Sequence, residues 1–155
     1  SGGAMTGAIT TNSTFDGVDI ATRDAVLTST TTTANAALPK AGGTMTGSAH
    51  GSTDTDTSNT GSVTLNFTTN QNFVLTLTGN VTLANPTTET VGQSGFITFI
   101  QDGTGSRTVA LGTDYETAGG SGLTLTSTAS ATDIVPYVVV ASGRILLGTP
   151  QLAFA

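Results

Sequence analysis

The stretch that decides the fold class runs from Ser62 to Leu83 and reads SVTLNFTTNQNFVLTLTGNVTL. Val63, Leu65 and Phe67 alternate with polar residues, and the same alternation returns over 73–77. Successive side chains of a strand point to opposite faces, so this pattern indicates strands with one buried and one solvent-facing side. The stretch therefore predicts a β-domain that buries its own core.

Short apolar runs continue to the C-terminus, and Gly, Asn-Pro and Ser-Gly turn signals separate them. The expected strands lie at 63–67, 73–77, 81–83, 96–100, 109–111, 123–126, 135–141 and 145–147. About eight strands over roughly 95 residues are typical of an antiparallel β-sandwich of jelly-roll or related type. We expect turns at 78–80 and 102–105, and Pro136 places the start of its strand at an edge or a bulge.

Threonine, glycine and a scarcity of charge mark the composition. Thr accounts for 35 of the 155 residues and Gly for 20, while charged residues make up 9%, against roughly 25% in ordinary soluble domains. Thr is β-branched and fits pleated strands. The mainly β composition, with uncharged polar surfaces, is typical of extracellular and virion proteins.

Several function classes are disfavoured by the same numbers. A net charge of −6 disfavours nucleic acid as a partner, because binding a phosphate backbone needs clustered cations. The chain has no cysteine, which excludes disulfides and thiolate metal sites. It has no apolar run long enough to span a bilayer, so we expect no membrane insertion.

A repeat marks the N-terminal part of the chain. The motif SGGAMTG at 1–7 returns as AGGTMTG at 41–47, and we interpret each copy as a joint in a stem, with glycines that permit tight turns. Because the chain starts within this motif, we expect it to be a piece of a longer protein. We accordingly predict a stem at 1–47, a linker at 48–61 and a β-domain at 62–155.

A helix is predicted over 20–38, between the two copies of the repeat. Heptad spacing relates Ile20, Asp24, Leu27, Thr31, Ala34 and Leu38, and the seam of a coiled coil is assigned to Ile20, Leu27, Thr31, Ala34 and Leu38. Asp19 or Thr22 can cap its start and Pro39 can end it. The run 28–33 costs about 3 kcal/mol of helix propensity, so the helix needs neighbouring chains. The alternative is an extended stem without a helix.

Two parts of the chain resemble tail fibre proteins of phages, especially marine ones. FDGVDIATRDAVL at 15–27 and AALPKAGGTMTG at 36–47 are similar to a repeat of those fibres. The segment from Phe73 to Ala155, with LTGNVTLANP at 77–86 and QDGTGSRT at 101–108, resembles the β-domain that follows such repeats. The resemblance implies a virion location, a parallel homotrimer, contact with other tail proteins through an N-terminal part, and host attachment. It implies no particular receptor residue.

Two loops are candidates for contact with a host-surface glycan or protein. The loop 102–107 lacks the ending of a phosphate loop, and we expect it to be a hairpin turn between 96–100 and 109–111. At 114–116 two carboxylates flank an aromatic residue, a composition found in sugar sites, although a plain loop is the alternative. The candidate receptor-binding residues are Asp102, Arg107, Asp114, Tyr115 and Glu116.

We expect no cofactor, no metal and no enzymatic activity. The run from Asp54 to Ser58 begins like a calcium loop, but the sixth and twelfth positions hold Asn59 and Leu65 instead of Gly and Glu. His50 is the only histidine and has no acid or cysteine partner in the pattern. The carboxylates at 114–116 have no sugar cleft fixed around them, which disfavours a depolymerase.

The leading interpretation is the distal part of a trimeric tail fibre whose β-domain touches the host. An architectural trimerisation or docking module of the virion and a bacterial surface adhesin are the alternatives. Phe96, Phe99, Tyr137 and Phe154 are expected in the core or in contacts between chains. The apolar end 152–155 is expected to form a strand that covers an edge or pairs between chains.

Overall fold

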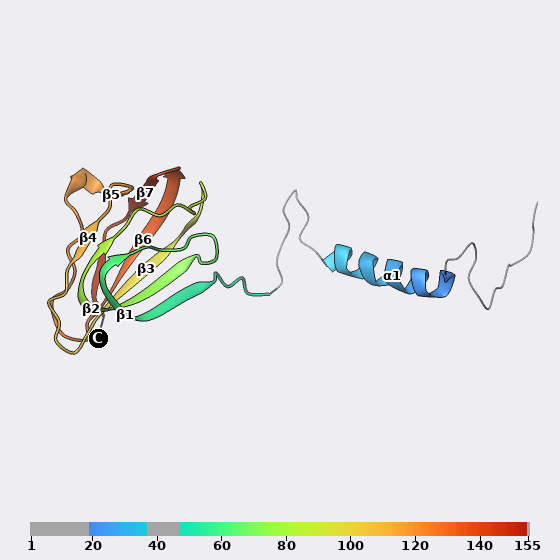
Figure 1. Cartoon of the computed structure of the whole chain (residues 1–155), viewed down its shortest axis with the longest axis horizontal. Coiled ribbons are helices and arrows are strands. Elements are labelled where there is room, and N and C mark those ends of the chain that lie inside the picture. Colours follow the sequence, from blue (N-terminus) through green and yellow to red (C-terminus); the bar gives the residue numbers. More distant parts are fainter. Residues whose placement is uncertain (1–18, 37–46, 155) are drawn as a thin grey trace, which may run out of the picture. The chain divides into compact units, whose positions relative to one another are not determined.

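The computed structural model describes residues 19–36 and 47–154, which belong to two separate units. The first unit contains helix α1, and the second, from His50 onward, is a β-domain (Figure 1). The repeat at 1–7, its copy at 41–47 apart from Gly47, and Pro39 lie outside the described residues.

Helix α1 spans Ile20–Ala36, so this segment is helical and not an extended stem. Asp19 caps its start, because its Oδ1 accepts a hydrogen bond from the Thr22 backbone N–H at 3.1 Å and its Oδ2 accepts one from the Thr22 hydroxyl at 2.8 Å. The backbone hydrogen bond from Thr22 is the main cause that lowers the pKa of Asp19.

The threonine run is accommodated by hydrogen bonds within the helix. Three hydroxyls donate to the carbonyl four residues earlier, those of Thr30, Thr32 and Thr33. Each of these polar groups has a partner without leaving the helical conformation. All side chains described at 21–34 are nevertheless exposed, including the seam residues Leu27, Thr31 and Ala34. The side chain of Ile20 and the whole of Leu38 lie outside the described part.

The β-domain is built on a single mixed sheet, so the prediction of a mainly β domain is confirmed. Its strands are β1 Thr53–Val63, β2 Asn72–Leu83, β3 Ser94–Gln101, β4 Val109–Leu111, β5 Tyr115–Thr117, β6 Thr132–Ala141, β7 Arg144–Leu147 and β8 Gln151–Phe154. The strand order is β1-β2-β3-β6-β7-β5, with β4 also paired to β2 and β8 to β6. A short 3-10 turn, Ala118–Gly120, follows β5.

The direction of the strands corrects the prediction of an antiparallel domain. β2 runs parallel to β1, β3 and β4, and β5 runs parallel to β7. β6 is antiparallel to β3, β7 and β8. Apolar alternation records which face of a strand is buried and leaves open which way its neighbour runs. The predicted hairpin between 96–100 and 109–111 is therefore wrong, since β3 and β4 both pair with β2.

Parallel neighbours are joined by crossing segments that cover the core. The segment 64–71 leads from β1 to β2 and buries Leu65 and Phe67, whose alternation had predicted a strand. The next crossing segment, 84–93, holds the first one in place. The Thr88 hydroxyl accepts from the Phe67 N–H at 3.0 Å, and the Gln93 amide donates to the Phe67 carbonyl at 3.0 Å.

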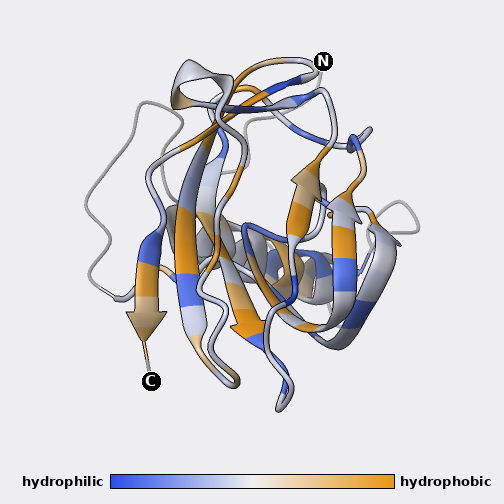
Figure 2. Cartoon of the chain, turned by 90° about the vertical axis from the view of Figure 1, so that its left-hand side faces the viewer, coloured by the Kyte–Doolittle hydropathy of each residue, from blue (hydrophilic) through white to orange (hydrophobic). Residues whose placement is uncertain are grey.

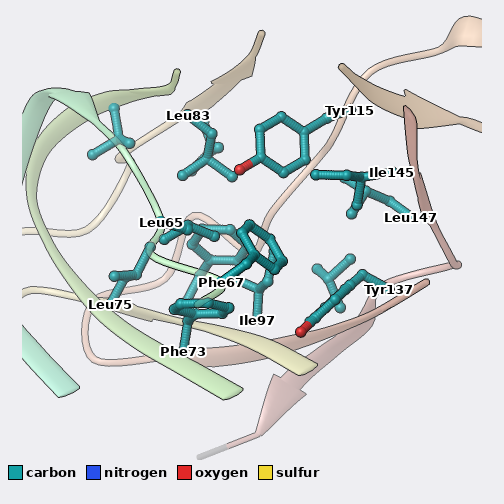
Figure 3. Close-up of a cluster of buried hydrophobic side chains, with 14 of the residues drawn as sticks. Leu65, Phe67, Phe73, Leu75, Leu83, Ile97, Tyr115, Tyr137, Ile145 and Leu147 are labelled. Atoms are coloured by element: carbon teal, nitrogen blue, oxygen red, sulfur yellow. The ribbon is translucent and has the colours of Figure 1, made fainter. Parts of the chain in front are cut away.

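The core lies between the sheet and these segments (Figure 3). Its aromatic centre is Phe67, whose ring centroid lies 5.0 Å from that of Phe73 and 5.3 Å from that of Tyr137. β4, which pairs with β2, continues through 112–114 into β5, which pairs with β7. The chain closes around the core through this connection. Burial of each of these core side chains stabilises the folded state by about 1.5–3 kcal/mol relative to leaving it exposed.

The predicted linker 48–61 is largely a strand, because β1 begins at Thr53. Most side chains of β1 are exposed, so the sequence has no alternation of apolar residues there from which a strand could be predicted. Its β-branched threonines fit a strand, and backbone pairing with β2 provides its hydrogen bonds. The turn predicted at 78–80 is instead part of β2. A Cβ at Gly79 would overlap the hydroxyl of Thr60, so glycine permits the close approach of β1 there.

Two further predictions differ from the structure, and the predicted C-terminal strand is present. Residues 123–126 form no strand, although Leu123 and Leu125 pack against the core. Pro136 lies inside β6, which is paired on both sides, at the point where the neighbour changes from β8 to β7. At this point no neighbouring strand needs a hydrogen bond from the backbone N–H of residue 136, so proline, which lacks that N–H, is tolerated. The apolar C-terminus forms β8 along β6, as expected of a segment that covers an edge.

Asp133 is a buried carboxylate, 2% exposed, that ties the C-terminus to the sheet. It accepts hydrogen bonds from the Thr126 N–H at 2.6 Å, the Thr126 hydroxyl at 2.8 Å and the Ala153 N–H at 2.8 Å. One side chain thus connects the 123–130 loop, β6 and β8.

Replacing Asp133 by Ala is expected to lower the free energy of unfolding by about 3 kcal/mol, because buried donors then lose a charged acceptor. Chemical denaturation measures this, with Asp54→Ala at the partly exposed edge strand β1 as the control, expected to change stability by less than about 0.5 kcal/mol. Equal effects of the two substitutions would contradict the assigned role of Asp133.

Candidate functional site

The first candidate pair, Asp102 and Arg107, holds its own loop in shape. Arg107 donates to Asp102 Oδ2 through Nη2 at 2.8 Å and through Nε at 3.2 Å. Asp102 Oδ1 accepts from the N–H groups of Thr104 and Gly105 at 3.0 and 2.9 Å. The hydrogen bond from Arg107 is the main cause that lowers the pKa of Asp102. Both side chains are thus engaged within the loop 102–107.

A buried amide that the sequence analysis did not identify supports the same loop. Gln101 is 3% exposed at the end of β3. Its Oε1 accepts from the Arg107 N–H at 2.9 Å, and its Nε2 donates to the Arg107 carbonyl at 2.9 Å. The two bonds replace the ladder hydrogen bonds that a hairpin would have made. Gln101 occupies the same alternate positions of the strand as the buried residues Ile97 and Phe99. This alternation in the sequence could have indicated that Gln101 is buried.

Tyr115, expected to face a ligand, is instead part of the core (Figure 3). It is 5% exposed, and its ring lies near Leu83. Burial, followed by the charges of Asp114 and Glu89, raises the pKa of Tyr115 well above its ordinary value of 10. Its neighbours in sequence point away from the core, since alternate residues of a strand face opposite sides.

Glu116 forms an ion pair with Arg144, which the sequence analysis did not single out. Arg144 Nε lies 2.8 Å from Glu116 Oε1, and Arg144 Nη2 lies 3.0 Å from Oε2. The pairing lowers the pKa of Glu116 and raises that of Arg144, mainly through these hydrogen bonds. The two residues meet because β5 and β7 are neighbours, although they are far apart in sequence.

A hollow of about 430 Å³ adjoins this ion pair. It is lined by Leu111, Gly112, Tyr115, Glu116, Thr117, Gly120 and Gly122. Asp114 lies at the turn before β5, where the Asn85 side-chain oxygen accepts from its N–H at 3.1 Å. Of the candidate residues, Asp114 and Glu116 are the two that remain partly exposed in this region.

A larger groove of about 860 Å³ lies elsewhere, on the side of the sheet away from the core. Its apolar lining is Val74, Phe96, Ile134 and Pro136. We call this side of β2, β3, β6 and β8 the outer face. The sequence of β6, TDIVPYVVVA, could have indicated an apolar outer face, because it is apolar at positions that point to both sides of the sheet.

No metal centre is found among the residues that the structure describes. Within the run considered as a calcium loop, Asp56 Oδ1 accepts a hydrogen bond from the Ser58 N–H at 3.0 Å. His50 is exposed at the start of the β-domain. The helix in the described part is too short and too polar to cross a membrane.

Comparison with known proteins identifies the class of the chain. Residues 55–144 match the model of a family described as "Putative phage tail fibre C-terminal domain". The match runs from β1 to the start of β7 and covers more than half of the chain. No match is found among curated proteins or among solved structures. The chain belongs to this family of phage tail fibre domains, and it is a structural component of a phage virion.

Acidification is expected to remove the stability that Asp102 contributes. The folded pKa of Asp102 lies below its ordinary value of 3.8. The contribution is therefore fully present above pH 3.8 and is lost as the pH falls through the lowered folded pKa. The Tm of the unmodified chain should exceed that of Asp102→Asn at about pH 6, and the difference should shrink as the pH falls below about 4. A Tm difference independent of pH would contradict the assigned interaction.

Proposed function

We propose that this chain is the distal part of a homotrimeric tail fibre and that its β-domain contributes to attachment at the host surface. The observation that carries the proposal is a helix with an exposed heptad seam, α1, in the same chain as a tail fibre domain. A lone helix of this length is marginal in water. Neighbouring copies would bury Leu27 and the rest of the seam. That the assembly contains three copies is inferred from the resemblance to trimeric fibres.

Attachment would work by multivalent binding. Weak sites, one in each chain, gain affinity when a common axis holds them at fixed distances. The fibre would also associate with other tail proteins of the virion. The fibre thus acts at the outside of the particle.

The receptor contact is assigned to the hollow beside the Glu116–Arg144 ion pair. Glu116 lines this hollow and is paired with Arg144, and Gly120 and Gly122 of the lining offer backbone groups. A host glycan or a polar protein loop presents matching hydroxyl and amide groups. Tyr115 would support this hollow from the core, and the pair Asp102–Arg107 would hold the loop 102–107 in shape without direct contact with a receptor.

A purely architectural role is the second candidate function. It is favoured by the number of candidate residues that are already engaged within the chain. Asp102 pairs with Arg107, Glu116 pairs with Arg144, and Tyr115 is buried. In this case the β-domain would end the fibre or dock another virion protein.

The seam predicts different effects for two neighbouring residues of α1. Leu27 and Val26 are 59% and 58% exposed, and only Leu27 belongs to the seam. Leu27→Asp is expected to reduce the native mass of the chain toward that of a single copy, because a carboxylate would be buried between helices. Val26→Asp is the matched control and should leave the mass unchanged. The same mass for both variants would contradict the seam, and native mass spectrometry decides between them.

Binding of the full chain to host cells tests the attachment role. Arg144→Gln removes the cation beside the hollow and frees Glu116, and we expect at least tenfold weaker binding through the loss of repeated contacts. Asp54→Asn on β1 is the control, expected to bind like the unmodified chain. Fluorescent labelling and cell-surface titration measure both. Absence of binding by the unmodified chain would favour the architectural role.

A further inference from the structure

The outer face of the β-domain is apolar although it lies outside the core. Residues that are opposite one another on neighbouring strands project to the same side of a sheet. The register places Phe96 opposite Pro136, Thr98 opposite both Val74 and Ile134, and Thr132 opposite Phe154. The apolar residues of this face include Val74, Phe96, Ile134, Pro136, Val138 and Phe154. Figure 2 shows apolar residues along the strands, including the C-terminal half of β8.

Three of these side chains are exposed in the single chain, while Val74, Ile134 and Pro136 are partly buried. Phe96 is 50% exposed, Phe154 is 47% exposed and Val138 is 37% exposed. Single exposed apolar residues are ordinary on a protein surface, whereas a contiguous set on one sheet face marks a contact surface. The groove of about 860 Å³ lies within this set, so the surface is also hollowed.

The outer face carries no charge on β2, β3, β6 or β8, in a chain whose net charge is −6. The acidic side chain of β6, Asp133, points to the other side and is buried. The ion pair of Glu116 with Arg144 joins β5 and β7 and is neutral as a pair. Contact between two identical acidic chains costs least where neither brings a carboxylate, and the outer face meets that condition.

Three of the polar side chains that line the groove, those of Gln71, Asn72 and Tyr137, make hydrogen bonds within the chain. The Gln71 amide donates to the Ser94 carbonyl at 2.9 Å, and Asn72 Oδ1 accepts from the Phe96 N–H at 3.2 Å. The Tyr137 hydroxyl donates to the Gln71 carbonyl at 2.7 Å. A glycan needs unengaged donors and acceptors, whereas an apolar protein surface does not. The lining therefore suits a protein contact better than a sugar.

We infer that the outer face is the surface through which the β-domains of neighbouring copies of this chain contact one another. The inference deepens the proposed function, because it assigns a contact surface to the assembly proposed there. A second copy brings the same uncharged, apolar surface. The exposed apolar residues of α1 point independently to neighbouring copies. The groove is lined in part by Gly51 and Thr53, at the start of the β-domain.

Two matched cysteine variants test this contact, and the chain has no other cysteine. Val138→Cys places a thiol on the outer face, and Val91→Cys places one on the crossing segment 84–93, away from it. Val138 and Val91 are 37% and 62% exposed, so exposure alone predicts alkylation rates that differ by less than about twofold. In the full-length chain at a concentration where it is assembled, we expect the thiol at 138 to react at least tenfold more slowly.

The native mass of each variant, measured in the same sample, separates the possible results. An assembled mass with equal rates at both thiols would overturn the outer-face contact and leave the proposed assembly standing. A single-chain mass would overturn both. As a second measurement, Phe96→Lys should raise the concentration at which the assembly dissociates by at least tenfold, and Val91→Lys should not. An unchanged dissociation concentration for Phe96→Lys would count against the contact.

Discussion

The structure of the β-domain depends on the burial of one face of β2. Phe73, Leu77 and Leu83 on this strand are fully buried, and β2 pairs with three other strands. Because β1, β2 and β3 run parallel to one another, the chain must cross the domain between β1 and β2 and again between β2 and β3. The crossing segments bring Leu65 and Phe67 over the same side chains. The apolar face of β2 thus determines where the connections run as well as where the strands lie.

This arrangement closes one side of the sheet and leaves the other side open. The crossing segments and the connection through 112–114 enclose the core. Nothing within the β-domain covers Phe96 or Val138 on the outer face. In α1, Leu27 is exposed in the same way. Both units of the chain therefore present exposed apolar side chains, which is the basis of the proposed assembly of several copies.

The charged residues serve chiefly to hold loops and edges of the fold. Asp102 with Arg107 shapes one loop, Glu116 with Arg144 joins two strands, and Asp133 ties the C-terminus to β6. A chain with few charges has few left for binding once these roles are met. The hollow beside Glu116 is where charge and partial exposure coincide, and for that reason the receptor contact is proposed there.

The sequence by itself determined the class of fold, the helix and the family. Alternation over 73–77 predicts a half-buried strand because side-chain direction is a local property of an extended backbone. The start of α1 at Asp19 follows equally from local hydrogen bonding. The tertiary structure decided the strand directions, the strand at Thr53–Val63, the burial of Tyr115 and the pairing of Glu116 with Arg144. These features depend on which distant segments become neighbours, and a pattern of polar and apolar residues along one chain records the side that is buried but not the neighbour that buries it.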